Sequence, residues 1–188
     1  MRKNFIATIT FLATSLILFV LSGCQPDSKT KTEGLHIKTS FYPIYALTKE
    51  ISGDVNQVEL MVKQVSIHSY EPSPHLVAKL YDGDIFIYHS KLLEAWAADL
   101  APQLKQKGVT VLEGAAQLPL DRVQGLERVP LKKGMSADAL NDPHTWTDPL
   151  LASQEADAIA TLLAKKDPAH KAYYFKNACL LYTSPSPR

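Results

Sequence analysis

Two short motifs hold the residues of this chain that are best suited to chemistry, and each motif carries one histidine. The first is Ile67-His68-Ser69-Tyr70-Glu71-Pro72-Ser73, and the second is Asp142-Pro143-His144-Thr145-Trp146-Thr147-Asp148-Pro149. Both are rich in turn-forming residues and precede a helical pattern, and ligands usually bind at such loops beside an α/β sheet. Neutral imidazole is the commonest metal ligand in proteins. The motifs therefore predict a metal site, which a folded lobe must assemble because the two histidines lie far apart in the sequence.

Each of these histidines has carboxylates close to it. Glu71 follows His68, and Asp142 and Asp148 flank His144. A carboxylate beside a ligating histidine often orients the ring, but it equally often only caps the following helix. The spacing contains no compact metal motif such as His-x-x-x-His. Residue chemistry alone therefore leaves a metal-binding pair and a purely structural pair of histidines equally open.

The chain has six histidines, and three of the remaining four have simple explanations. His36 lies in an alternating strand pattern, and His75 and His170 lie near expected helix starts, so these three are expected to be structural or solvated. His89 ends the apolar run 85–88, at the sheet edge where ligands gather. A role at the site therefore stays open for His89.

Short apolar runs alternate with helical patterns along most of the chain. Strands are expected at 35–41, 58–62, 85–88 and 109–112, and helices at 44–51, 72–80, 92–106, 150–165 and from about residue 170. This alternation predicts an α/β fold with a parallel sheet flanked by helices on both faces. The helix over 150–165 is expected to bury a stripe formed by Leu151, Ala158, Ile159, Leu162 and Leu163. The segment 113–141 breaks the pattern and predicts a long surface connection.

The first 34 residues read as an export signal followed by a tether. A basic start and an apolar run lead to Leu21-Ser22-Gly23-Cys24, in the layout of a secretory signal rather than of a membrane span. Residues 21–24 resemble the lipobox of bacterial lipoproteins, which implies that Cys24 is lipidated. Residues 1–23 are thus expected to be the lipoprotein signal peptide and 24–34 a flexible tether. An uncleaved signal anchor is the alternative, which the short apolar run disfavours.

The last ten residues do not fit the pattern that precedes them. Residues 179–188 resemble the translated read-through of a sequencing adapter, and Pro185 and Pro187 could not continue the preceding helix. We therefore expect 179–188 to be a non-native tail and 35–178 to be the N-terminal part of a longer protein. A natural disordered tail is the alternative.

Composition limits the classes of function. Lysine and arginine number 20 against 19 aspartates and glutamates, so nothing suggests nucleic acid or an anionic membrane surface as a partner. A hydrophobic share of 46% is enough for a core. With Cys24 expected to be lipidated and Cys179 in the expected tail, no disulfide is predicted.

Five segments together resemble the metal-binding lipoproteins of bacterial ABC importers for zinc and manganese, and among these most of all the laminin-binding-protein (Lmb) zinc lipoproteins. The segments are 39–45, 67–73, 88–90, 93–96 and 142–149. The resemblance covers about residues 35–178. It implies that this region is the N-terminal metal-binding lobe of a two-lobe solute-binding protein and ends in the start of the helix that links the lobes. The metal would lie in the cleft between the lobes.

The resemblance also carries site residues. His68 and His144 match the first two metal ligands of the family, and His89 matches none of its ligands. The second lobe would supply a further histidine or glutamate and a carboxylate. The chain departs from the family pattern at two places. Gln64-Val65-Ser66 stands where a Gly-containing stretch is usual, and Asn141 stands where an aromatic or acidic residue is more common. The lack of a His-rich loop fits the laminin-binding subgroup.

The resemblance implies a lipid-anchored, extracellular protein of the cell membrane that binds Zn(II), has no enzymatic activity and delivers the metal to the permease of an ABC importer. We expect a monomer, with laminin or another matrix protein as a further partner. Mn(II) is the alternative metal, since carboxylate-rich sites suit it and the deciding ligand lies in the second lobe. A zinc metallohydrolase with Glu71 or Asp148 as base is a weaker alternative, because the chain has no metal-plus-base helix motif.

Overall fold

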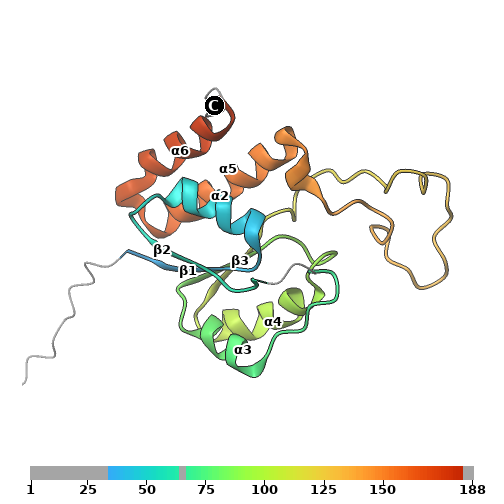
Figure 1. Cartoon of the computed structure of the whole chain (residues 1–188), viewed down its shortest axis with the longest axis horizontal. Helices are drawn as coiled ribbons and strands as arrows, with labels where there is room; N and C mark the ends of the chain where they lie inside the picture. Colours follow the sequence, from blue (N-terminus) through green and yellow to red (C-terminus); the bar gives the residue numbers. More distant parts are fainter. Residues whose placement is uncertain (1–33, 64–66, 184–188) are drawn as a thin grey trace, which may run out of the picture. The chain divides into compact units, whose positions relative to one another are not determined.

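The structure is a computed structural model that describes residues 34–63 and 67–183 (Figure 1). These residues belong to one structural unit, Glu33–Arg188. The predicted signal peptide 1–23, the predicted lipidation site Cys24 and nearly all of the tether lie outside the described residues. So do Gln64-Val65-Ser66 and the residues from 184 onward. None of the described helices combines the length and the apolar character that crossing a membrane requires.

Four short strands of the described chain form a parallel sheet in the order β2-β1-β3-β4. The strands are β1 (His36–Thr39), β2 (Gln57–Leu60), β3 (Ile85–Tyr88) and β4 (Thr110–Glu113). The inner strand β3 is buried along its whole length, and the inner strand β1 alternates between half-buried and buried residues. Such burial is typical of a parallel sheet that helices cover on both faces. The four strands predicted from the sequence are confirmed, with small shifts at their ends.

The helices lie in two layers (Figure 1). One face of the sheet carries α2 (Tyr42–Ser52), α5 (Pro149–Lys166) and α6 (Lys171–Thr183), and the other carries α3 (Pro74–Tyr81) and α4 (Ala95–Gln106). The chain passes from β1 to β2 on one side and then crosses back to β3 and β4 on the other. In such a doubly wound sheet, the carboxyl ends of β1 and β3 diverge and leave a crevice that commonly binds ligands.

Local sequence signals set the ends of α2 and α3. Pro43 occupies the first turn of α2, where a missing N–H costs nothing. Gly53 ends α2 with φ 55°, and its backbone N–H donates to the Lys49 carbonyl over 2.8 Å. The hydroxyl of Ser73 caps α3 by accepting the backbone N–H of Leu76 over 3.3 Å. These caps fix where the chain turns after β1 and before α3.

Two helices differ from their prediction. The expected helix 92–106 begins only at Ala95, because the N–H groups of Leu93 and Glu94 first close turns onto the Ser90 carbonyl. In α5, Ile159 and Leu163 are buried as expected, but Leu151, Ala158 and Leu162 are only partly buried. The buried face of α5 is instead rich in small residues, which allow it to pack closely against α2 and α6. The members of this face are Ala152, Glu155, Ala156, Ile159, Ala160, Leu163 and Ala164.

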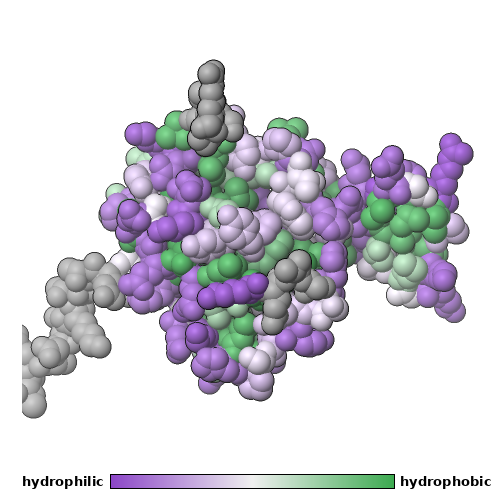
Figure 2. Space-filling model, in the orientation of Figure 1, coloured by the Kyte–Doolittle hydropathy of each residue, from purple (hydrophilic) through white to green (hydrophobic). Residues whose placement is uncertain are grey.

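The connection between β4 and α5 is long and contains no helix or strand before the short turn η1 (Thr145–Thr147). An isolated antiparallel bridge between Arg122 and Asn141 closes its base. The Arg122 guanidinium also donates to the carbonyls of Leu126, Glu127 and Val129 over 3.3, 3.3 and 2.6 Å. This connection projects from the layered part of the molecule and carries apolar side chains on its surface (Figures 1 and 2). The predicted surface connection is confirmed.

A short turn, η2 (Pro168–His170), links α5 to α6. The α6 helix continues beyond residue 178, where we expected the natural sequence to end, and Tyr174 and Ala178 are its buried residues. The boundary of the non-native tail therefore coincides with no change in secondary structure, and it stays a prediction.

Candidate metal centre

His68 and His144 meet beside the crevice at the carboxyl edge of the sheet. Their ring centres lie 5.4 Å apart, and the ring planes are inclined at 54°. Both rings line an open cavity of about 440 Å³. The other lining residues come from the ends of β1 and β2 and from the second motif: Phe41, Tyr42, Pro43, Leu60, Val62, Lys63, Ile67 and Trp146. The fold thus brings together the two histidines that the sequence singled out.

The separation of the two rings can be compared with a shared metal ion. Two imidazoles on one tetrahedral zinc ion, with Zn–N bonds of about 2.0–2.1 Å, have ring centres about 5 Å apart. The observed 5.4 Å is close to this value. Across 34–63 and 67–183, no group of three or more His, Cys, Asp or Glu side chains could hold a metal ion. The pair therefore resembles half of a tetrahedral site.

His144 is oriented by the carboxylate that precedes it. Oδ1 of Asp142 accepts the ring Nδ1–H of His144 over 2.6 Å and its backbone N–H over 2.9 Å. These two bonds, of which the backbone bond has the larger effect, hold the pKa of Asp142 below its usual value. With the proton on Nδ1, the Nε2 lone pair of His144 is the one available to a metal.

Asp148, the other carboxylate of the second motif, has a different role. Its side chain caps α5 by accepting the backbone N–H groups of Leu150 and Leu151 over 2.7 and 3.2 Å. Between the two carboxylates, the Thr147 hydroxyl donates to the His144 carbonyl over 2.7 Å and tightens the turn η1. The sequence left orientation of the ring and helix capping open for both carboxylates. In the structure, Asp142 orients the ring and Asp148 caps the helix.

The first motif exposes His68 by burying its neighbours. Ile67 is buried, and the Tyr70 N–H donates to the Ile67 carbonyl over 3.3 Å to close a turn around the exposed His68. Tyr70 packs edge-on against Trp96 of α4, with ring centres 5.8 Å apart. The His68 turn is thus anchored to the α4 layer, while its imidazole faces the cavity.

Trp146 forms an aromatic wall behind the pair. Its ring centre lies 5.2 Å from that of His144 and 5.1 Å from that of Phe41, with edge-to-face geometry in both cases. Aromatic contacts of this kind hold a ring in place as well as excluding water. An apolar wall beside ligands also limits solvent access to a bound metal.

His89 lies behind Trp146 and is fully buried. Its Nε2–H donates to the Pro143 carbonyl over 2.6 Å, and its Nδ1–H donates to Oε1 of Glu155 over 2.8 Å. Burial lowers the pKa of His89, but the hydrogen bond and charge of Glu155 outweigh burial and raise this pKa above its usual value. Both ring nitrogens of His89 are thus occupied by hydrogen bonds, which leaves neither of them free for a metal. His89 is not among the residues that line the cavity shared by His68 and His144.

The remaining histidines behave as the sequence predicted. His36 is half-buried in β1, and its backbone N–H donates to Oδ2 of Asp84 over 2.8 Å. His75 is exposed in the first turn of α3. His170 is exposed, and its Nδ1–H donates to Oδ2 of Asp167 over 2.7 Å.

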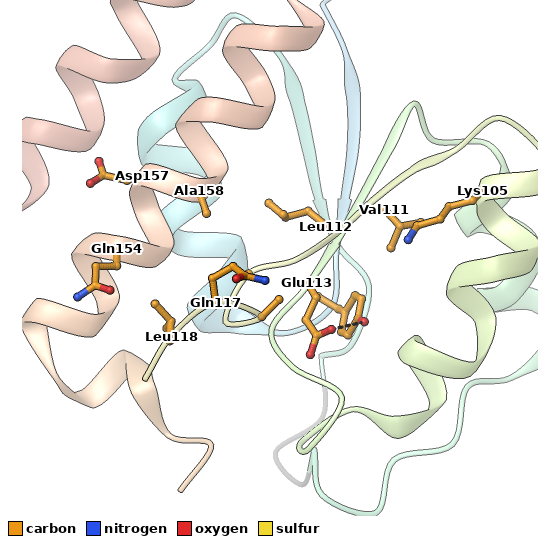
Figure 3. Close-up of a pocket in the computed structure, with 12 residues that line it drawn as sticks. Lys105, Val111, Leu112, Glu113, Gln117, Leu118, Gln154, Asp157 and Ala158 are labelled. Carbon is orange, nitrogen blue, oxygen red and sulfur yellow. Dashed lines mark hydrogen bonds between the residues drawn. The ribbon is translucent and has the colours of Figure 1, made fainter. Parts of the chain in front are cut away.

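A larger cavity of about 630 Å³ lies beside β4 and α5 rather than at the histidine pair (Figure 3). Glu113, one of the two acids that line it, accepts a hydrogen bond from the Tyr88 hydroxyl over 3.1 Å and another from the Lys91 backbone N–H over 2.8 Å. Among the described residues that line this cavity there is no histidine or cysteine. Chemistry rather than size therefore selects the smaller cavity as the candidate site.

Comparison with known proteins identifies the family. The model of the family described as "Zinc-uptake complex component A periplasmic" matches residues 37–182. This chain belongs to that zinc-uptake component family. Over 183 residues it is 30% identical to the high-affinity zinc uptake system protein ZnuA of Bacillus subtilis, covering 86% of this chain and 55% of that protein. Over 174 residues it is 32% identical to the zinc-binding lipoprotein AdcA of Streptococcus pneumoniae, covering 90% of this chain and 34% of that protein.

Solved structures extend the comparison within the zinc-uptake component family. AdcAII of Streptococcus pneumoniae is 45% identical, with a TM-score of 0.68, over 80% of this chain and 52% of that one. The laminin-binding protein Lmb of Streptococcus agalactiae, described as having adhesin and metal transporting activity, is 47% identical, with a TM-score of 0.67 over the same shares. The chain thus spans about half the length, or less, of the relatives it matches. The predicted α/β fold and the resemblance to zinc-binding lipoproteins are confirmed, and the family is one of binding components rather than enzymes.

Proposed function

We propose that this chain is the zinc-binding lobe of a solute-binding lipoprotein that captures extracellular Zn(II) and delivers it to the permease of an ABC importer. The observation that carries the proposal is the 5.4 Å separation of the His68 and His144 rings on an open cavity. The family membership supports the same assignment. In this account Nε2 of His144 and a ring nitrogen of His68 are metal ligands.

The ligand set supports capture rather than catalysis. Two imidazoles supply half of a tetrahedral zinc site, and a facing lobe of the kind found in two-lobe binding proteins would supply the other half. Asp148 cannot act as a general base while it caps α5. Imidazole also favours zinc over manganese, which prefers oxygen ligands. A solved AdcAII variant that is 47% identical to this chain is described as Zn(II)-bound.

The cellular setting is part of the proposal. Lipidation of Cys24 would hold the lobe at the outer face of the cell membrane, as a monomer beside its permease. Relatives described as lipoproteins support this placement. Adhesion to laminin is a second role, supported by the description of the Lmb relative as an adhesin. Binding of the zinc-loaded chain to immobilised laminin, against an unrelated lipoprotein as control, tests that second role.

Titration of this chain with Zn(II) and, separately, with Mn(II) at neutral pH tests the central assignment. We expect one zinc ion per chain, weaker binding of manganese, and marked loss of zinc affinity in both His68→Ala and His144→Ala. His75→Ala is the matched control, because it removes an exposed histidine of the same lobe away from the cavity. Zinc binding that is unchanged in both cavity variants would refute the assignment.

A further inference from the structure

We propose that His89 and Glu155 are positioning residues for the zinc site, which hold the loop that bears His144 against the end of β3. This inference rests on the proposed function, because it takes His144 to be a ligand. Neither residue contacts the metal in this account. Their role is to fix the backbone from which the His144 ring projects.

The contacts place His89 at the junction of three elements. Its backbone follows β3, and its N–H donates to Oε2 of Glu94 over 2.7 Å. Nε2 of its ring hydrogen-bonds to the Pro143 carbonyl over 2.6 Å, and Nδ1 hydrogen-bonds to Glu155 of α5 over 2.8 Å. The ring also packs edge-on against Trp146, with centres 5.0 Å apart. One side chain thus ties the sheet, α5 and the residue next to His144 together.

The polar contacts of the chain just before Pro143 lie within the projecting connection or at its exposed surface. The Asp142 N–H donates to the Asp121 carbonyl over 2.8 Å, and Asn141 pairs with Arg122, so these bonds join the connection to itself. Lys91 reaches Asp138 over 3.0 Å, but the lysine side chain is largely exposed. Exposed ion pairs contribute little to order. The bond from the buried His89 ring is therefore the contact that joins Pro143 to the end of β3.

The energetic cost of burying His89 and Glu155 favours a positioning role for this pair over a stabilising one. A buried ion pair often contributes less to stability than apolar side chains of the same volume. Glu155 is fully buried, and Oε2 of Glu155 has no hydrogen-bond partner in the described structure. Space is also kept for the carboxylate, since a Cβ at Gly114 would approach Oε1 of Glu155 to 2.5 Å. A fully buried polar pair held at this cost points to a role in geometry.

Zinc titration of four variants distinguishes a positioning role of His89 and Glu155 from a purely stabilising one. His89→Phe keeps a ring but removes both donors, and we expect zinc affinity to fall by about 10–100-fold, as for other residues that support metal ligands. Glu155→Gln keeps an acceptor for Nδ1–H and should bind zinc close to the wild-type level. Gly114→Ala pushes the carboxylate aside without removing it and should weaken binding even if His89→Phe fails to fold. Tyr174→Phe is the control, because it removes a hydroxyl that accepts a hydrogen bond from Asn56 and donates one to Asp167, at the opposite end of α5 from the site.

A spectroscopic measurement accompanies the titration. In the wild-type chain without metal, NMR should show NOEs between the rings of His144 and Trp146, whose centres lie 5.2 Å apart, and these NOEs should weaken in His89→Phe. Loss of stability alone would not change these NOEs, as Tyr174→Phe should demonstrate. If His89→Phe and Gly114→Ala keep both the zinc affinity and the NOEs of the control, the positioning role is refuted while the proposed function stands. If His68→Ala and His144→Ala leave zinc affinity unchanged, both proposals fall.

Discussion

Replacing Asp142 by alanine should weaken zinc binding, whereas replacing Asp148 by alanine should mainly weaken the fold. The two carboxylates flank the same histidine, but only Asp142 bonds to its ring, with 2.6 Å between Nδ1 of His144 and Oδ1. Without this acceptor the Nδ1 proton is no longer held, and the ring can present either nitrogen to the cavity. The ligand then loses both its fixed tautomer and its fixed orientation.

The magnitude follows from the exposure of the bond. Residues that orient a metal-binding histidine typically contribute 10–100-fold to metal affinity. The side chains of Asp142 and His144 are 51% and 41% exposed, and water competes for an exposed bond. We therefore expect the lower end, about 10-fold or about 1.4 kcal/mol. Asp148→Ala removes the cap of α5 and should cost about 1 kcal/mol of folding free energy, which lowers Tm by about 3 °C in a chain of this size.

Isothermal titration calorimetry with Zn(II) and thermal unfolding without metal give the two quantities for each variant. Asp142→Ala should change the zinc Kd more than Tm, and Asp148→Ala should change Tm more than Kd. Asp142→Asn should fall between alanine and wild type, since the amide oxygen can still accept from Nδ1–H. Equal effects of the two alanine variants on the zinc Kd would refute the division of roles between the two carboxylates.

Three further predictions follow from the same structure. The chain supplies two of about four zinc ligands, so we expect roughly half of the 10–16 kcal/mol of a complete structural site, which corresponds to a Kd between about 1 μM and a few hundred μM. Acidification through the range in which imidazole takes up a proton should abolish this binding. Calorimetry over a pH series measures both the Kd and its pH dependence. Burial raises the pKa of Asp167, but hydrogen bonds from Tyr174 and His170 outweigh burial and lower it. Asp167→Asn should therefore be less stable than wild type at neutral pH, and denaturant unfolding should show the difference shrinking as the pH falls through the lowered pKa of Asp167 in the folded state. Cys24→Ala in the secreted protein should shift it from the membrane fraction to the medium, and unchanged sedimentation with membranes would contradict lipidation.

The parts of the fold that the sequence predicts well are those with a local cause. The strand 85–88 is a continuous apolar run between polar turns, and the structure reproduces it as Ile85–Tyr88. The alternation of strands and helices then fixes a parallel sheet. The histidine motifs follow from this topology, because loops at the carboxyl edge of one sheet must lie near each other.

The parts that the sequence could not predict depend on partners distant in the chain. Glu155 is an acidic residue, yet it is fully buried, because the ring of His89, 66 positions earlier in the chain, forms a hydrogen bond with its side chain. The orientation of α5 follows from this pair and from its small side chains rather than from its large apolar residues. His89 was correctly placed at the sheet edge, but only the second motif folded over it shows that both its nitrogens are occupied.

X-ray absorption spectroscopy of the zinc-loaded chain counts the imidazole ligands of the bound ion. We expect a zinc ion with two imidazole nitrogens at about 2.0–2.1 Å and oxygen ligands in the remaining positions. The imidazole count should fall to one in either His68→Ala or His144→Ala and stay at two in His75→Ala. A zinc environment without imidazole, or one whose imidazole count is unchanged in both cavity variants, would contradict the claim that these two histidines share one zinc ion.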